Sequence, residues 1–189
     1  MNQLTLGRAI ASICAFAMLP MTAIAQDAIV VNVDNFNRAQ TDHEFAGTLK
    51  MTGGINTFVH NRAPTPVDKQ NVIRMNRDTL YSMAIVDISK GATITLPDAG
   101  KRYMSLMVVN NDGYVNKVFY GAGKHELTVE QFDTPFVFVA VRTLANPEDK
   151  ADLAEAHELQ NQFKIDAGSA QAYARTSASS RWPPAAATG

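Results

Sequence analysis

The sequence predicts an α+β protein that is mainly β: an antiparallel β-sandwich or jelly-roll-like sheet with an N-terminal and a C-terminal helix packed at its periphery. Short apolar runs separated by turn residues fill the middle of the chain, from Thr79 to Thr143. A stretch with apolar residues at helical spacing precedes them, and a second one follows. With 189 residues, the chain is long enough for one domain with its own hydrophobic core.

Residues 1–25 have the composition of a secretory signal peptide. Arg8 supplies a positive charge, residues 9–24 form an apolar run, and the segment closes on an Ala-x-Ala site. We therefore expect cleavage between Ala25 and Gln26 and a periplasmic or secreted protein. An uncleaved anchor is disfavoured because the apolar run is shorter than the roughly 20 residues that a bilayer span needs. We expect no membrane span after cleavage.

Cleavage also removes Arg8 and Cys14. The formal net charge changes from −1 to −2, because Arg8 is the one charged residue of the segment. A nearly neutral chain has no field that would gather nucleic acid or an anionic membrane, so we expect neither as a partner. Cys14 is the single cysteine of the chain. The mature protein would then have no disulfide, no thiol nucleophile and no thiolate metal ligand.

The N-terminal helix is predicted over residues 33–51, where apolar residues recur at spacings of three and seven. Asp34 is placed to cap its first turn, and Gly53 follows its end. Residues 55–71 contain two prolines and form an extended connection, which carries His60.

Turn residues divide the middle of the chain into strands. We predict strands at residues 80–87, 92–96, 103–110, 114–120, 125–128 and 136–143. The sequence Gly121-Ala122-Gly123 is expected to form a hairpin turn. Residues 103–110 and 136–143 do not alternate strictly between apolar and polar, so both strands should be covered on both faces.

A second helix follows the strands. Residues 146–149 supply a turn and a cap, and apolar residues from Leu153 to Phe163 trace one helix face. We predict one domain over residues 26–165. Residues 166–189 are rich in Ala, Ser, Thr and Pro, and we expect them to form a disordered tail.

Three long segments have an unusual composition: NVIRMNRDTLYSMAIVDISKGATITLPDAGKRYMSLMVVNNDGY, VFYGAG and VAVRTLANPEDKADLAEAHELQ. In this order, and together with the helix before them, they resemble the family called domain of unknown function 1254 over residues 33–165. The resemblance implies a mainly β domain with peripheral helices and no established activity. Larger relatives carry a second domain, the domain of unknown function 1214, for which this chain is too short. We therefore expect a stand-alone periplasmic form.

Two groups of polar residues are candidate sites. In the first, Asn76, Arg77 and Asp78 lie at the entrance to an apolar strand that begins with Leu80 and Tyr81. Here Arg77 would bind a polar or anionic ligand, and Asp78 would act as a base or hydrogen-bond acceptor. The alternative is structural: an internal salt bridge, with Asp78 accepting hydrogen bonds from turn amides.

The second group is spread over the predicted strands and their turns: Arg102 and Tyr103 at the start of a strand, Asn110, Asp112 and Tyr114 at a turn, Tyr120 beside Gly121, and Arg142 near the end of a long apolar strand. Arg142 follows three apolar residues, so it is either a ligand clamp or half of a structural ion pair with Asp78 or Asp87. The tyrosines either line a pocket for sugars or aromatic compounds or fill the sheet surface.

The four histidines have no metal-ligand spacing, so we expect no metal and no cofactor. His60 remains a candidate acid or base because it lies on a polar loop. We therefore weigh two functions. The first is a module that binds a small polar molecule or another envelope protein. The second is a hydrolase or lyase of a small polar envelope substrate, with Asp78 and His60 as acid and base and Arg77 or Arg142 as the clamp.

Overall fold

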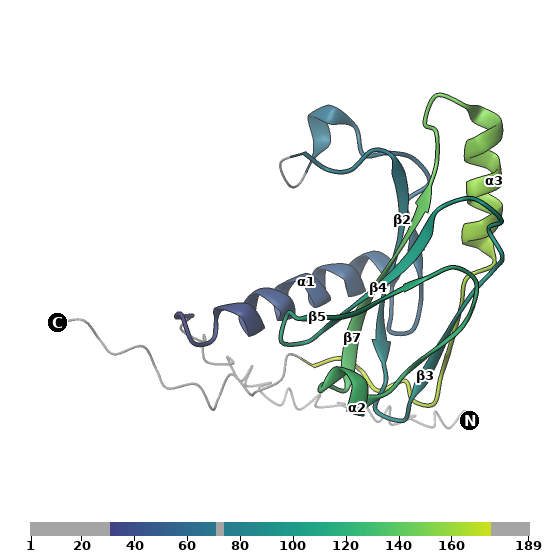
Figure 1. Cartoon of the computed structure of the whole chain (residues 1–189). Helices are drawn as coiled ribbons and strands as arrows, with labels where there is room; N and C mark the ends of the chain where they lie inside the picture. The colour runs from purple at the N-terminus through teal and green to yellow at the C-terminus, as the bar shows by residue number, and fades with distance from the viewer. Residues whose placement is uncertain (1–30, 71–73, 175–189) are drawn as a thin grey trace, which may run out of the picture.

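The computed structural model describes residues 31–70 and 74–174 (Figure 1). Its elements are α1 (Phe36–Thr52), β1 (Val59–His60), the 3-10 helix η1 (Val67–Lys69), β2 (Thr79–Asp87), β3 (Ala92–Leu96), β4 (Met104–Asn110), β5 (Val115–Tyr120), β6 (Gly123–Leu127), α2 (Val129–Phe132), β7 (Phe136–Leu144), α3 (Lys150–Asn161) and β8 (Lys164–Ala167). The predicted signal peptide lies outside the described residues. Within them, no helix has the length and apolar character of a bilayer span.

The strands form two antiparallel sheets. The larger sheet has the order β1-β2-β7-β4-β5, and the smaller has the order β6-β3-β8. One hydrophobic core joins the two sheets and includes Val86 of β2, Ile94 of β3, Leu106 of β4 and Val139 of β7. The predicted class, a mainly antiparallel β protein with helices around it, is confirmed.

The central strand β7 is covered on its inner face, and on its other face around Phe136 and Phe138, so the coverage predicted from its continuous apolar sequence is confirmed for that part of the strand. Val137, Val139 and Val141 point into the core that is shared with the smaller sheet. Phe136 and Phe138 point the other way and pack in a second cluster with Phe45 of α1. Figure 1 shows α1 crossing this second face of the larger sheet, while β3 lies on the opposite side. We call the face that α1 crosses the outer face.

Helix α1 begins later than its sequence predicts. Its N-cap is Asn35, not Asp34, and the side chain of Asn35 accepts a hydrogen bond from the Asn32 amide instead of capping the helix. The helix ends where it was expected to, because Gly53 adopts a left-handed conformation with φ of 74° and its amide bonds to the Leu49 carbonyl.

The predicted hairpin at Gly121-Ala122-Gly123 is wrong. β5 pairs with β4 in the larger sheet, whereas β6 pairs with β3 in the smaller sheet. The glycines therefore lie where the chain passes from one sheet to the other. Gly121 and Gly123 both have positive φ, at 80° and 122°, which a side chain with a Cβ atom would resist.

The chain after residue 165 is ordered further than the predicted tail boundary. Residues 164–167 form β8 and pair with β3, and the amide of Gly168 bonds to the carbonyl of Gly91. Beyond it, Tyr173 packs against Phe45 and Phe136 on the outer face. Residues 166–174 are thus part of the fold, because they complete the smaller sheet and fill a gap beside α1. The remainder of the predicted tail lies outside the described residues.

A buried carboxylate ties this C-terminal segment to the central strands. Asp87 is fully buried at the end of β2 and accepts hydrogen bonds from the amide and hydroxyl of Ser89 and from the amide of Gln171. Burial alone would raise the pKa of Asp87, but these hydrogen bonds, with a further one from Ser169, outweigh it and hold the pKa below its ordinary value.

We expect the stabilisation from Asp87 to depend on pH. Because the folded-state pKa is depressed, the contribution is complete above the ordinary value of 3.8 and is lost as pH falls through the lower folded-state pKa. In urea unfolding near neutral pH, Asp87→Asn should have a lower free energy of unfolding than the natural chain. The difference between the two free energies should become smaller in acid. Asp166→Asn, at an exposed position on β8, controls for the change in net charge. A difference in the free energy of unfolding that is the same at every pH would contradict a pH-dependent stabilisation by Asp87.

Candidate functional site

The outer face of the larger sheet carries a row of polar and aromatic side chains beyond the contacts of α1. Alternation along each strand sends odd-numbered residues of β2 and β4 and even-numbered residues of β5 and β7 to this face. The register places Tyr81 beside Arg142, Arg142 beside Ser105, and Ser105 beside Tyr120. We call these four residues, together with Tyr103, the Arg142 face.

Arg142 lies at the centre of this face, because β7 runs between β2 and β4. Its guanidinium carbon is 5.3 Å from the centre of the Tyr81 ring, which is a cation–π distance. The Nε atom of Arg142 is buried and has no hydrogen-bond partner among the described residues. The guanidinium is therefore held in place by an aromatic ring, with hydrogen-bonding capacity left over.

The predicted ion pair of Arg142 with Asp78 or Asp87 is wrong, since the ion pairs of the described residues do not include Arg142. Asp87 pairs with Phe136, at the opposite end of β7 from Arg142. Asp78 precedes β2, and its side chain is exposed. A residue count along the sequence could not reveal this separation, because it depends on which strands pair and in which register.

The tyrosines of the Arg142 face lie around its edge. The Tyr103 hydroxyl donates to the Ser105 Oγ atom at 3.1 Å, and the Tyr103 and Tyr120 rings are 6.3 Å apart. Tyr103 is 44% exposed and Tyr120 is 67% exposed, so both rings offer free aromatic surface. Ser105 was not singled out in the sequence, although a lone hydroxyl within the apolar run from Met104 to Val109 was a usable signal.

The first predicted group is used mainly for a turn. The Asn76 Oδ1 atom accepts hydrogen bonds from the Asp78 amide at 2.8 Å and the Thr79 amide at 3.1 Å. The side chain that accepts hydrogen bonds from the turn amides is therefore that of Asn76 and not, as the structural alternative predicted, that of Asp78. The side chains of Arg77 and Asp78 are exposed, and neither has a polar partner among the described residues. Among the described residues, no hydrogen bond or ion pair joins the Asn76, Arg77 or Asp78 side chain to Arg142, and of this group Tyr81 alone contacts it.

His60 lies on the inner side of the sheet. Its Nδ1 atom is 2.8 Å from the Ser82 hydroxyl, and its ring stacks on Phe58. Burial, followed by the charge of Arg62, lowers the pKa of His60 and favours the neutral ring. Ser82 is fully buried. The structure therefore brings His60 together with a buried serine and does not bring it together with Asp78.

Arg102 is engaged in structural contacts. Its Nη2 atom lies 2.8 Å from the Asp152 carboxylate and 2.9 Å from that of Glu155, and its Nη1 atom donates to the Leu144 carbonyl. These contacts fasten the approach to β4 onto α3. Of the predicted ligand-binding residues, Tyr81, Tyr103, Tyr120 and Arg142 therefore share one face, while Asn76, Arg77 and Arg102 lie elsewhere.

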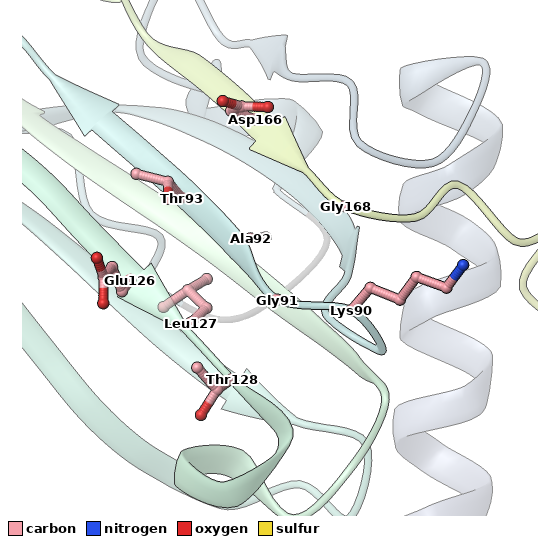
Figure 2. Close-up of a pocket in the computed structure, with 9 residues that line it drawn as sticks. All are labelled: Lys90, Gly91, Ala92, Thr93, Glu126, Leu127, Thr128, Asp166 and Gly168. Carbon is pink, nitrogen blue, oxygen red and sulfur yellow. The ribbon is translucent and has the colours of Figure 1, made fainter.

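An open hollow of about 350 Å³ lies at the end of the smaller sheet (Figure 2). The register sets Thr93 of β3 between Glu126 of β6 and Asp166 of β8, and all three side chains are labelled in Figure 2. In the part of the chain that the structure describes, no three His, Cys, Asp or Glu residues are grouped as metal ligands would be.

The fold and the site together define a β-sandwich with an arginine at the centre of one outer face. Residues 55–128 match the model of a family described as "Protein of unknown function (DUF1254)". This match confirms, over that segment, the family resemblance predicted from the sequence. The family description names no activity. No curated protein matches the chain.

Among solved structures, the chain is similar to the VPA0106 protein from Vibrio parahaemolyticus, with 18% sequence identity and a TM-score of 0.55. The similarity covers 78% of this chain and 40% of that one, so the chain spans less than half the length of that protein. The likeness supports the β-rich fold.

Proposed function

We propose that this protein is exported and binds a small organic anion on the Arg142 face. The observation that carries the proposal is the state of Arg142: its guanidinium has no carboxylate partner among the described residues, and its Nε atom is buried without a hydrogen bond. An arginine side chain stays charged at any physiological pH, and a partly buried cation without a counter-charge favours an anion.

The neighbours of Arg142 suit a small anion. Ser105 provides a hydroxyl in the adjacent register position, and Tyr103 is bonded to that hydroxyl. Tyr81 holds the guanidinium by its ring face, which leaves the N–H groups of the guanidinium plane for a ligand. A carboxylate matches these N–H groups, because its two oxygens can accept two of them at once.

Export is the second part of the proposal and rests on residues 1–25, with their positive charge, apolar run and Ala-x-Ala ending. Binding is favoured over catalysis because the suggested acid and base face different surroundings: His60 bonds to a buried serine, while Asp78 is exposed. A small anion is also favoured over an envelope protein as the ligand, because the special feature of the site is a single cation and not a broad apolar surface.

Replacement of Arg142 by methionine should remove anion binding. In calorimetry with acetate, benzoate, hexanoate and succinate, at least one carboxylate should bind, and Arg142→Met should weaken it at least about tenfold, since a hydrogen bond to a charged group contributes about 1.5–3 kcal/mol. Arg142→Lys keeps the charge without the planar fork and should bind with intermediate affinity.

Two controls make this test specific. Arg77→Met removes an exposed arginine outside the Arg142 face and should leave the affinity unchanged. The matching amides, acetamide, benzamide and hexanamide, have similar shapes but no charge and should bind at least tenfold more weakly. The proposal is contradicted if no carboxylate binds, if the amides bind equally well, or if Arg77→Met and Arg142→Met have the same effect.

A further inference from the structure

The row of residues next to the Arg142 face, on the side toward α1, is apolar. The register places Met83 of β2 beside Ala140 of β7, Ala140 beside Met107 of β4, and Met107 beside Val118 of β5. Successive residues on one face of a strand are about 7 Å apart, so this row lies about 7 Å from the row of Arg142 along the strands.

These apolar side chains add little to the hydrophobic core. Met83 and Met107 are half-buried, yet neither belongs to any of the three core clusters of the described residues. Val118 is 37% exposed. On either side of the buried Ala140, the row therefore presents the partly exposed side chains of Met83, Met107 and Val118 beside Arg142, which has no carboxylate partner among the described residues.

The middle of the row consists of one small side chain between two flexible ones. Ala140 has the shortest side chain of the row and is 3% exposed, with a flexible methionine on either side. Methionine is unbranched and polarisable, and it adapts to ligands of irregular shape. If the two methionine side chains turn outward, the small Ala140 side chain leaves the lowest part of the surface between them.

The outward residues of β7 thus form a strip with two different ends. Arg142 is the charged end, Ala140 the middle, and Phe138 the apolar end, where it packs with Phe45 of α1. From Arg142 to Phe138 the strip is about 13 Å long, at about 3.3 Å for each strand residue. We call Arg142, Ala140 and Phe138, with Met83 and Met107 at the sides, the β7 strip.

We infer that the ligand of the Arg142 face is an amphipathic monocarboxylate, whose carboxylate bonds to Arg142 and whose hydrocarbon part lies along the β7 strip toward Phe138. This inference rests on the proposed function and narrows its ligand class. A dicarboxylate of the same length is excluded, because its second charge would be placed on apolar surface without a partner.

Calorimetry with straight-chain carboxylates tests the inference. Propanoate, pentanoate and heptanoate should bind with rising affinity, about fourfold for each methylene that is buried. Heptanedioate should bind at least tenfold more weakly than heptanoate, since its second carboxylate would lose its hydration. Heptan-1-ol, which has the same chain without the charge, should also bind at least tenfold more weakly.

Two variants locate the hydrocarbon part of the ligand. Ala140→Leu fills the middle of the β7 strip and should weaken heptanoate at least tenfold while leaving propanoate within twofold. Ala154→Leu, at an exposed position on α3, is the matched control and should change neither ligand. Met107→Ser removes apolar surface without adding bulk, so it tests the β7 strip even if Ala140→Leu does not fold. It should reduce the increase in affinity from propanoate to heptanoate.

The outcomes separate this inference from the proposed function. Suppose that propanoate and heptanoate bind with equal affinity and that Arg142→Met abolishes the binding of both. That result contradicts the amphipathic ligand but agrees with the anion site of the proposed function. If affinity still rises with chain length in folded Ala140→Leu and Met107→Ser variants, the hydrocarbon part of the ligand does not lie on the β7 strip. Equal binding of heptan-1-ol and heptanoate, unaffected by Arg142→Met, overturns the anion site itself.

Discussion

Replacement of Gln160 by alanine is expected to lower the free energy of unfolding by about 3 kcal/mol. Gln160 is fully buried in α3, and its amide group joins that helix to β1 and β2. Its Nε2 atom donates to the Asn61 carbonyl at 3.2 Å and to the Ser82 hydroxyl at 3.1 Å, while its Oε1 atom accepts from Arg62 at 3.2 Å. Alanine would remove these three hydrogen bonds and leave a cavity at a fully buried position.

The comparison variant for Gln160 is its neighbour Asn161. The Asn161 side chain also accepts a hydrogen bond from Arg62, at 2.7 Å, but it is exposed and water can replace it. Asn161→Ala should therefore cost less than about 1 kcal/mol. Urea unfolding followed by circular dichroism measures both changes. If the two alanine variants lose the same stability, burial of the Gln160 network is not what holds α3 to the sheet.

Tyr173→Ala should lower the free energy of unfolding by about 2–3 kcal/mol, although this residue lies in the segment that composition marks as a tail. The Tyr173 ring is 5.5 Å from that of Phe45 and 5.2 Å from that of Phe136. Its hydroxyl donates to the Asp42 carboxylate, which also accepts from Asn111 at 2.9 Å. Burial, and then the bond to Asp42, raises the pKa of Tyr173, which keeps the hydroxyl protonated as the donor.

Gln171→Ala provides the control for Tyr173. The contact of Gln171 with Asp87 runs through its backbone amide, and its side chain is exposed, so truncation should change stability by no more than about 0.5 kcal/mol. Tyr173→Phe keeps the ring and loses only the hydroxyl, so it should lie between the two alanine variants. Equal stabilities for Tyr173→Ala and Gln171→Ala would show that the Tyr173 side chain contributes nothing to the stability of the fold.

The strands were predictable because local chemistry defines them. Residues 92–96 were predicted as a strand, and β3 has these bounds, since Gly91 before it and Pro97 after it end regular pairing on both sides. The continuous apolar run of residues 136–143 also correctly predicted a strand, which is covered on both faces around Phe136 and Phe138. These features depend on the sequence within a few residues, and that is why a single sequence contains them.

Partner choice was not predictable in the same way. A Gly-Ala-Gly link is suitable both for a hairpin and for a chain that changes sheets, and only the distant strands β3 and β4 decide between the two. The strand β8 is short, with alternating exposed and half-buried residues, and its pairing with β3 is what makes it a strand. From composition, its last two residues were predicted to begin the disordered tail.

The candidate site was predicted in part. Arg142 and the tyrosines were named from their residue types, but their convergence follows from the register across β2, β7, β4 and β5, which sequence spacing does not contain. The same register excludes the expected partner of Arg142, because it sets Asp87 at the far end of the neighbouring strand. Loop residues such as Asn76 were misjudged because turn capping and ligand binding use the same polar side chains.

The pairing of β2 with β7 also determines when the centre of the larger sheet can form. Thr79 pairs with Leu144 and Asp87 with Phe136, so the central ladder joins strands that have β3, β4, β5 and β6 between them in the chain. Contacts between residues far apart in sequence require a large loss of chain entropy before the contacts themselves stabilise the fold. Sheets built from such contacts fold in milliseconds to seconds. A newly synthesised chain can pair β4 with β5, but the edges of β2 and β4 that pair with β7 stay open until Leu144 is available, and a chaperone can bind them throughout that interval.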